Sequence, residues 1–182
     1  MRFLPTTLRD VVLVEPRVHG DERGFFMETW HRERFAQAGI DCQFVQDNHS
    51  LSGRGTLRGL HYQLQNTQGK LVRVVAGEVF DVAVDVRRSS PDFGKWVGVT
   101  LSAANKRMLW VPPGFAHGFY VTSGQAEFLY KCTELYDPAS ERTLAWNDPE
   151  VGVQWPLVPG MEPLLSAKDL QGRLLAEADV FP

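Results

Sequence analysis

The sequence lacks the features that mark several large classes of protein. It has no long apolar run, and its first residues, Met1–Thr6, do not form the apolar stretch of a signal peptide, so neither secretion nor a membrane span is predicted. Its net charge is −3, whereas proteins that bind nucleic acid in bulk present a basic surface. We therefore expect a cytoplasmic protein that binds neither membranes nor nucleic acids.

Cysteines and histidines are scarce. Cys42 and Cys132 form no C-x-x-C pair, which is typical of free thiols in a reducing compartment. The histidines show no His-x-His or His-Glu-x-x-His spacing, and the chain has His61-Tyr62-Gln63 where small β-barrels often carry two metal-binding histidines. The sequence therefore predicts no metal. It also lacks a dinucleotide glycine fingerprint, a Walker loop and a serine nucleophile elbow, so we expect no cofactor and no serine nucleophile.

What the sequence does contain is a series of short β-strands separated by glycine and proline turns. Its 182 residues, 43% of them hydrophobic, suffice for one domain with a sizeable core. Strands are predicted at residues 11–14, 25–29, 42–48, 58–63, 70–75, 78–86, 96–101, 107–111, 115–121 and 127–135. Helices are predicted at residues 30–38 and 166–178, a loop at 50–55, and a turn at 113–114. Many short strands and few helices indicate an antiparallel sandwich or barrel.

Two further predictions concern how these elements connect. Residues 70–75 and 78–86 flank the turn Ala76-Gly77, and the second run alternates with a period of two, so we expect a β-hairpin. No repeat, low-complexity segment or linker interrupts the chain before about Asp148, after which prolines become frequent. We therefore expect a single domain, residues 1–182, with a C-terminal appendage from about residue 148 that packs on the barrel.

The segment of residues 58–63 concentrates polar and ionisable side chains in one strand. Strand alternation places Arg58, Leu60 and Tyr62 on one face, and Gly59, His61 and Gln63 on the other. If the second face lines a cavity, His61 can act as a general base, because imidazole titrates near neutral pH. A core histidine with both nitrogens hydrogen-bonded fits the same pattern. The segment alone leaves both interpretations open.

Three other residues are candidates for acid–base chemistry. Lys70 could stabilise an oxyanion, Tyr130 could protonate a carbanion, and Asp169 could orient His61. Each has a structural alternative: a solvated lysine at a strand end, a buried structural tyrosine, and a helix-capping aspartate. The spacing from Ser166 taken alone favours the cap. The candidate partners for a phosphate-bearing ligand are Arg23, Arg58 and Lys168. The alternative is that all three are ordinary surface cations.

Several segments, in order along nearly the whole chain, resemble motifs of the dTDP-4-dehydrorhamnose 3,5-epimerase family of cupin-type proteins. They are GDERGFF (20–26), VQDNHS (45–50), LRGLHYQ (57–63), QGKLVR (68–73), GEVFDVAVD (77–85), PGFAHGF (113–119) and LSAKD (165–169). The resemblance implies a mainly β protein. Its fold would be an antiparallel double-stranded β-helix, a jelly-roll or cupin-like barrel, with a few short peripheral helices.

The resemblance also implies roles for individual residues. His61 would be the general base and Asp169 its partner in a dyad, while Lys70 would stabilise an enolate and Tyr130 would act as the acid. The residues that match positions lining the nucleotide-sugar site are Arg23, Phe26, Glu28, Gln46, Asn48, Arg58, His117, Glu141 and Lys168. Members of the family are homodimers that exchange N-terminal strands. Arg23 and Glu28 would therefore act in the partner subunit's site.

The implied reaction converts dTDP-4-dehydro-6-deoxy-D-glucose into dTDP-4-dehydro-L-rhamnose by epimerisation at C3 and C5. A proton α to the C4 ketone is removed to give an enolate, which requires neither a metal nor a nicotinamide. The alternatives are an epimerase that acts at C3 only, a non-catalytic nucleotide-sugar-binding cupin and a metal-dependent cupin oxygenase. His19 and Leu135 stand where the family often has aromatic residues, so the way in which the thymine is held stays open.

Overall fold

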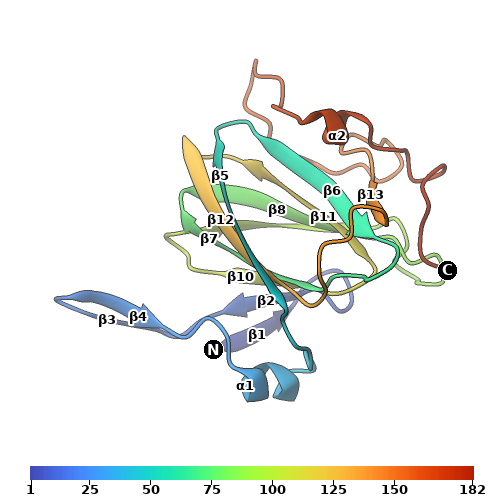
Figure 1. Cartoon of the computed structure of the whole chain (residues 1–182). Helices are drawn as coiled ribbons and strands as arrows, with labels where there is room; N and C mark the ends of the chain where they lie inside the picture. Colours follow the sequence, from blue (N-terminus) through green and yellow to red (C-terminus); the bar gives the residue numbers. More distant parts are fainter.

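A computed structural model, which describes all of residues 1–182, shows a molecule made mainly of β-strands (Figure 1). One six-stranded sheet has the order β1 (Arg2–Pro5), β2 (Val12–Glu15), β10 (Met108–Val111), β7 (Lys70–Ala76), β12 (Gln125–Cys132) and β5 (Gln46–Gly53). A five-stranded sheet has the order β13 (Glu141–Thr143), β6 (Leu57–Gln63), β11 (Phe115–Val121), β8 (Glu78–Asp85) and β9 (Trp96–Ser102). A separate hairpin consists of β3 (Val18–Asp21) and β4 (Gly24–Met27).

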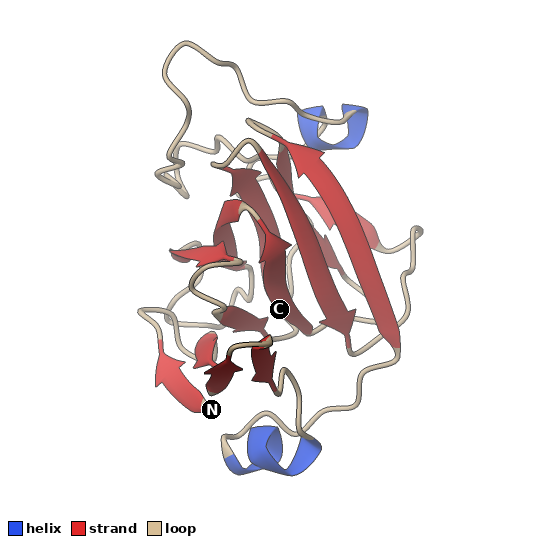
Figure 2. Ribbon diagram, turned by 90° about the vertical axis from the view of Figure 1, so that its left-hand side faces the viewer, coloured by secondary structure: helices blue, strands red, loops and turns tan.

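All neighbouring strands in these sheets run antiparallel. The two helices, α1 (Arg32–Gln37) and α2 (Ala167–Leu170), are short and lie at opposite ends of the molecule (Figure 2). Neither helix has the length or apolar character that crossing a membrane would require. The predicted mainly β, antiparallel fold with a few short peripheral helices is confirmed.

The main core lies between the two sheets. Alternate apolar side chains of the six-stranded sheet, among them Val72 and Phe128, pack against inward-facing residues of the five-stranded sheet, among them Ala83, Leu101 and Phe119. The rings of Phe119 and Phe128 stack with their centroids 4.2 Å apart, so an aromatic contact joins the two sheets directly. This packing holds the sheets at a fixed separation.

The outer face of each sheet is covered by a different segment. Phe35 of α1 packs with Leu71 and Met108 on the six-stranded sheet. On the five-stranded sheet, Leu60 and Tyr62 form a cluster with residues of the C-terminal segment. The members contributed by that segment are Val151, Leu175 and Ala178. We infer that residues 1–182 form one domain of which this segment is an integral part.

The predicted hairpin around Ala76-Gly77 is wrong. β7 pairs with β10 and β12, whereas β8 pairs with β9 and β11 in the other sheet. The turn therefore carries the chain from one sheet to the other. Gly77 has a φ of 74°, and a Cβ at this position would lie 1.9 Å from the Gln125 carbonyl oxygen, so the corner requires glycine. A hairpin and a corner between sheets share the same alternation and the same turn residues, which is why the sequence pattern did not separate them.

Several predicted boundaries also change. The strand predicted at 42–48 begins at Gln46 and continues to Gly53, through the predicted loop at 50–55, because every residue of β5 pairs with β12. The strand predicted at 127–135 is β12, residues 125–132, and the helix predicted at 30–38 is α1, residues 32–37. The helix predicted at 166–178 ends at Leu170. It ends there because the backbone of Arg173 bonds to Thr143 and Ala145, which requires an extended chain.

Candidate active site

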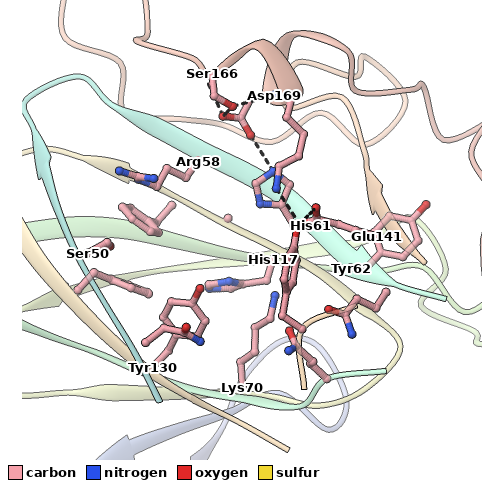
Figure 3. Close-up of a pocket in the computed structure, with 18 of the residues that line it drawn as sticks. Ser50, Arg58, His61, Tyr62, Lys70, His117, Tyr130, Glu141, Ser166 and Asp169 are labelled. Carbon is pink, nitrogen blue, oxygen red and sulfur yellow. Dashed lines mark hydrogen bonds and ion pairs between the residues drawn. The ribbon is translucent and has the colours of Figure 1, made fainter. Parts of the chain in front are cut away.

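A cavity of about 430 Å³ opens between the two sheets at the end that carries α2 (Figure 3). Its walls come from β5, β7 and β12 on one side and from β6 and β11 on the other, with α2 at its rim. The lining residues predicted from the sequence are Gln46, Asn48, Arg58, His61, Lys70, His117, Tyr130, Glu141, Lys168 and Asp169. The fold thus gathers residues that are more than 100 positions apart in the chain around one space.

The carboxylate of Asp169 is held by four hydrogen bonds. Its Oδ1 lies 2.7 Å from Nε2 of His61 and 3.1 Å from the amide nitrogen of Gly59. Its Oδ2 accepts from the hydroxyl of Ser166 at 2.6 Å and from the Ser166 amide at 3.1 Å. Burial acts to raise the pKa of Asp169, but the bonds from His61, Ser166 and Gly59 outweigh it and hold the pKa well below its ordinary value. Asp169 therefore stays ionised at neutral pH.

The ionised state of Asp169 decides which nitrogen of His61 carries the proton. A carboxylate can only accept hydrogen bonds, so Nε2 of His61 must be the N–H donor, and Nδ1 is left as the basic atom. Burial is the largest influence on this imidazole and lowers its pKa, while the bond to Asp169 opposes that effect. His61 is therefore neutral at pH 7 and has a free Nδ1, as a general base requires.

Lys70 extends from the cavity floor toward the imidazole of His61 (Figure 3). Burial lowers the pKa of its ammonium, and the neighbouring Cys132, Glu141 and Asp81 oppose this effect. No hydrogen bond or ion pair in the structure occupies Nζ of Lys70. An ammonium in this position is available to an oxyanion that forms in the cavity.

Tyr130 stands in the opposite sheet from His61. It belongs to β12, and its phenol lies inside the cavity (Figure 3). Burial raises the pKa of the phenol, so the hydroxyl remains protonated at neutral pH and can donate a proton. A neutral base on one wall and a protonated acid on the other suit chemistry on both faces of a bound ring.

A second histidine lies beside the first. His117 of β11 is directly opposite His61 in the antiparallel register of β11 and β6. Its Nε2 is 3.0 Å from both oxygens of the buried Asp81. The two strands are in backbone contact here, because a Cβ on Gly59 would lie 2.6 Å from Cα of Gly118.

The strand face predicted for Arg58 is wrong. Arg58 nevertheless lines the cavity, as expected. Alternation grouped Arg58 with Leu60 and Tyr62, which are buried on the outer face of the sheet. The structure places Arg58 in the cavity wall with His61, because the pairing of β6 with β11 shifts register between His117 and Phe119. The extra residue lies in β6 between Arg58 and His61, and a bulge of this kind interrupts the alternation, so that residues on its two sides can share a face.

Comparisons with known proteins identify the family of the chain. The family model described as dTDP-4-dehydrorhamnose 3,5-epimerase matches residues 5–177. The chain belongs to this family. The dTDP-4-dehydrorhamnose 3,5-epimerase of Pseudomonas aeruginosa is 58% identical over 183 residues, which cover 100% of both chains. The predicted family and enzyme class, a carbohydrate epimerase, are confirmed.

Two solved structures extend the comparison. The dTDP-6-deoxy-D-glucose-3,5-epimerase of Legionella pneumophila, in complex with dTDP-4-keto-L-rhamnose, has a TM-score of 0.94 and 53% identity, covering 98% of this chain and 94% of that one. A 3'-monoepimerase from Streptomyces bikiniensis, in complex with dTDP-quinovose, has a TM-score of 0.88 and 36% identity, covering 94% of this chain and 87% of that one. The cupin-like fold predicted for the family is confirmed.

Three residues expected in the epimerase site lie outside this cavity. Arg23 and Phe26 belong to the β3–β4 hairpin, which projects from the body of the molecule (Figure 1). Nε of Arg23 is 3.1 Å from a carboxylate oxygen of Asp21, the side chain of Phe26 is 70% exposed, and Glu28 pairs with Arg34 at 2.6 Å. Within a single chain, these three residues therefore do not contribute to the cavity.

Sequence reasoning missed Tyr136 at the mouth of the cavity. Tyr136 is 51% exposed, its hydroxyl donates to Glu141 at 2.9 Å, and its amide donates to the side chain of Gln46 at 2.9 Å. Lys168 bonds to the other oxygen of Glu141 at 2.8 Å. The available signal was an aromatic residue just after the predicted strand. The family pattern pointed instead to the neighbouring Leu135, which does not line the cavity.

Proposed function

We propose that the chain epimerises dTDP-4-dehydro-6-deoxy-D-glucose at C3 and C5 to give dTDP-4-dehydro-L-rhamnose. The observation that carries this proposal is the placement of a neutral His61, with its Nδ1 free, across the cavity from a protonated Tyr130, with Lys70 in the same sheet as Tyr130. We expect no metal and no cofactor, because enolisation next to a ketone needs only a base, a donor to the oxygen and an acid.

The proposed reaction has three steps at each carbon. Nδ1 of His61 takes the proton α to the C4 ketone, and the electron pair of the C–H bond moves to the ketone oxygen to form an enolate. The ammonium of Lys70 stabilises this oxyanion, and one such donor contributes about 3 kcal/mol. The Tyr130 hydroxyl then protonates the carbon from the opposite face and inverts it. Exchange with solvent returns a proton to Tyr130 and removes one from His61.

The mouth of the cavity suits a nucleoside diphosphate. Arg58 and Lys168 supply cations for the diphosphate, and the exposed ring of Tyr136 offers a flat surface for the thymine. The other polar residues that we place in contact with the substrate are Gln46, Asn48, His117 and Glu141. The solved relative with a bound dTDP-sugar supports this class of ligand.

We further propose a cytoplasmic homodimer in which N-terminal strands are exchanged. The β3–β4 hairpin pairs only with itself, and all four residues of β3 are exposed. Phe25 and Phe26 leave large apolar surfaces uncovered, at 61% and 70% exposed. Insertion of this hairpin into a second copy would bury those rings and would bring Arg23, Phe26 and Glu28 to the partner's cavity.

The experiment that tests the reaction is incubation of the protein with dTDP-4-dehydro-6-deoxy-D-glucose in D2O, followed by NMR at C3 and C5. Deuterium at both carbons is the expected result. Deuterium at C3 alone would establish the first alternative, a C3-only epimerase, which the similarity to the Streptomyces bikiniensis 3'-monoepimerase keeps relevant. Retained binding with no exchange at either carbon would establish the second, a non-catalytic nucleotide-sugar-binding protein. Asp169→Asn is the matched variant, because it keeps the shape of the side chain and removes its charge.

A further inference from the structure

The first turn of α2 contains more hydrogen bonds than a helix cap needs. In a capping box, the N-cap hydroxyl accepts from the amide of residue N3, and the side chain of N3 accepts from the N-cap amide. Both bonds are present, from the Asp169 amide to Oγ of Ser166 at 3.2 Å and from the Ser166 amide to Oδ2 of Asp169 at 3.1 Å. A third bond, in which the Ser166 hydroxyl donates to the same Oδ2 at 2.6 Å, is additional.

The additional bond acts on the carboxylate that contacts the base. Oδ2 of Asp169 is held by Ser166, while Oδ1 faces Nε2 of His61 at 2.7 Å. With Oδ2 anchored at two points, the carboxylate cannot rotate about its Cβ–Cγ bond without breaking both bonds. The other bonds to this carboxylate come from His61 and from the Gly59 amide, and both reach Oδ1, so Oδ2 depends on Ser166 alone.

We propose that Ser166 is a positioning residue for the epimerisation. Its hydroxyl orients Asp169, and Asp169 in turn keeps the proton of His61 on Nε2 and leaves Nδ1 free to take the substrate proton. The proposal rests on the proposed function, because it assigns Ser166 a part in that same reaction. Ser166 acts through Asp169 and needs no contact with the substrate.

Three variants at this position separate positioning from capping. Ser166→Thr keeps a hydroxyl. Ser166→Gly removes the hydroxyl but keeps a residue that is favourable at the N-cap, and Ser166→Ala removes both. We expect Ala and Gly to lower kcat about tenfold with KM unchanged, as partners of an oriented histidine do elsewhere, and Thr to restore most of the loss. Unchanged kcat in both Ala and Gly would overturn the proposal, and so would a loss in Ala that Gly recovers.

A second readout does not depend on turnover. The pH titration of the His61 ring, followed by NMR in the substrate-free protein and assigned with His61→Asn, should move to lower pH in the Ala and Gly variants, because a loosened Asp169 stabilises the imidazolium less. An unshifted titration would overturn the proposal even if kcat fell. A wild-type protein without turnover would refute the proposed reaction and leave this titration as the separate test of Ser166.

The chain offers a matched control. Ser90 donates to Oδ2 of Asp85 at 2.6 Å, the same donor, acceptor and length as in the Ser166–Asp169 bond. Asp85 pairs with Arg87 and not with a histidine, and Ser90 lies outside the cavity. Ser90→Ala should leave kcat and the His61 titration unchanged. A fall in kcat equal to that of Ser166→Ala would show a general loss of stability and would overturn the proposal.

Discussion

The two histidines of the cavity, His61 and His117, stand on the neighbouring strands β6 and β11, and their aspartate partners differ in how the carboxylate is held. The carboxylate of Asp169 accepts from His61 and from three further donors, which keep its pKa low despite burial. In the other pair, the bonds to the buried Asp81 come only from His117, and burial raises the pKa of this carboxyl. The side chain of His61 is 20% exposed, whereas that of His117 is 8% exposed.

The difference shows that a hydrogen-bonded histidine and aspartate do not by themselves make a general base. The low pKa of the Asp169 carboxyl rests on the bond from His61 and also on bonds from Ser166 and Gly59, and His61 itself lines the cavity. Asp81 instead belongs to the surroundings of Lys70, whose pKa its negative charge helps to raise. We propose that the His61–Asp169 pair moves a proton, whereas Asp81 of the other pair affects the charge of Lys70.

The largest expected effect comes from exchanging each histidine for asparagine. His61→Asn should lower deuterium incorporation at both carbons on the order of 10³-fold, because it removes the base. His117→Asn should cost only about tenfold, since the amide can still donate to Asp81. The initial rates of exchange in D2O measure both. Equal losses in the two variants would contradict the assignment of different roles to the two pairs.

The next effect concerns stability. Asp169→Asn should lower the free energy of unfolding at pH 7 by about 2 kcal/mol, because the amide nitrogen would face donors that now bond to a carboxylate. Asp81→Asn should cost less, since burial already disfavours the charge of Asp81 and the amide can still accept from His117. Urea unfolding of both variants measures the difference.

The stability effect of Asp169 has a definite pH dependence. The folded pKa of Asp169 lies below its unfolded value of about 3.9, so its contribution is complete above that pH and is lost as the pH falls through the folded pKa. The gap between wild type and Asp169→Asn should therefore be present at neutrality and shrink in strong acid, below the unfolded pKa of Asp169. A gap that persists unchanged in strong acid would contradict the ionised state of Asp169.

The smallest effect is a shift of one arm of the pH–rate profile. Asp81→Asn removes a charge that raises the pKa of Lys70, so Lys70 should lose its proton at lower pH. The alkaline arm of kcat should then move to lower pH, with a loss of about tenfold at its alkaline end. The acid arm, which reports His61, should stay in place. A shift of the acid arm alone would contradict the separation of the two pairs.

The sequence carried most of the information about the strands and the site. Alternation and turn residues located ten strands, β2 and β4 to β12, because they report local geometry, whereas β1, β3 and β13 were not predicted. Family resemblance selected the cavity residues because motifs such as LSAKD preserve spacing. Spacing alone favoured a helix cap for Asp169, and the structure shows that the cap and the contact with His61 coexist on the two oxygens of one carboxylate.

The errors share one physical cause. In each case, the partner with which a segment pairs decides the outcome. This holds for the corner at Gly77, for the bulge that returns Arg58 to the cavity side and for the short α2. Local patterns contain no information about that partner. The same limitation explains why the exposed ring of Tyr136 was overlooked, since its place at the mouth depends on contacts with Gln46 and Glu141.

The backbone contact between Gly59 and Gly118 has a consequence for how this enzyme family can diverge. Because two glycines bring the strands of His61 and His117 together, the distance between the two imidazoles is set by main-chain atoms. A substitution elsewhere in the core does not act on this contact, whereas a Cβ at either glycine would collide with the facing backbone and push the two histidine strands apart.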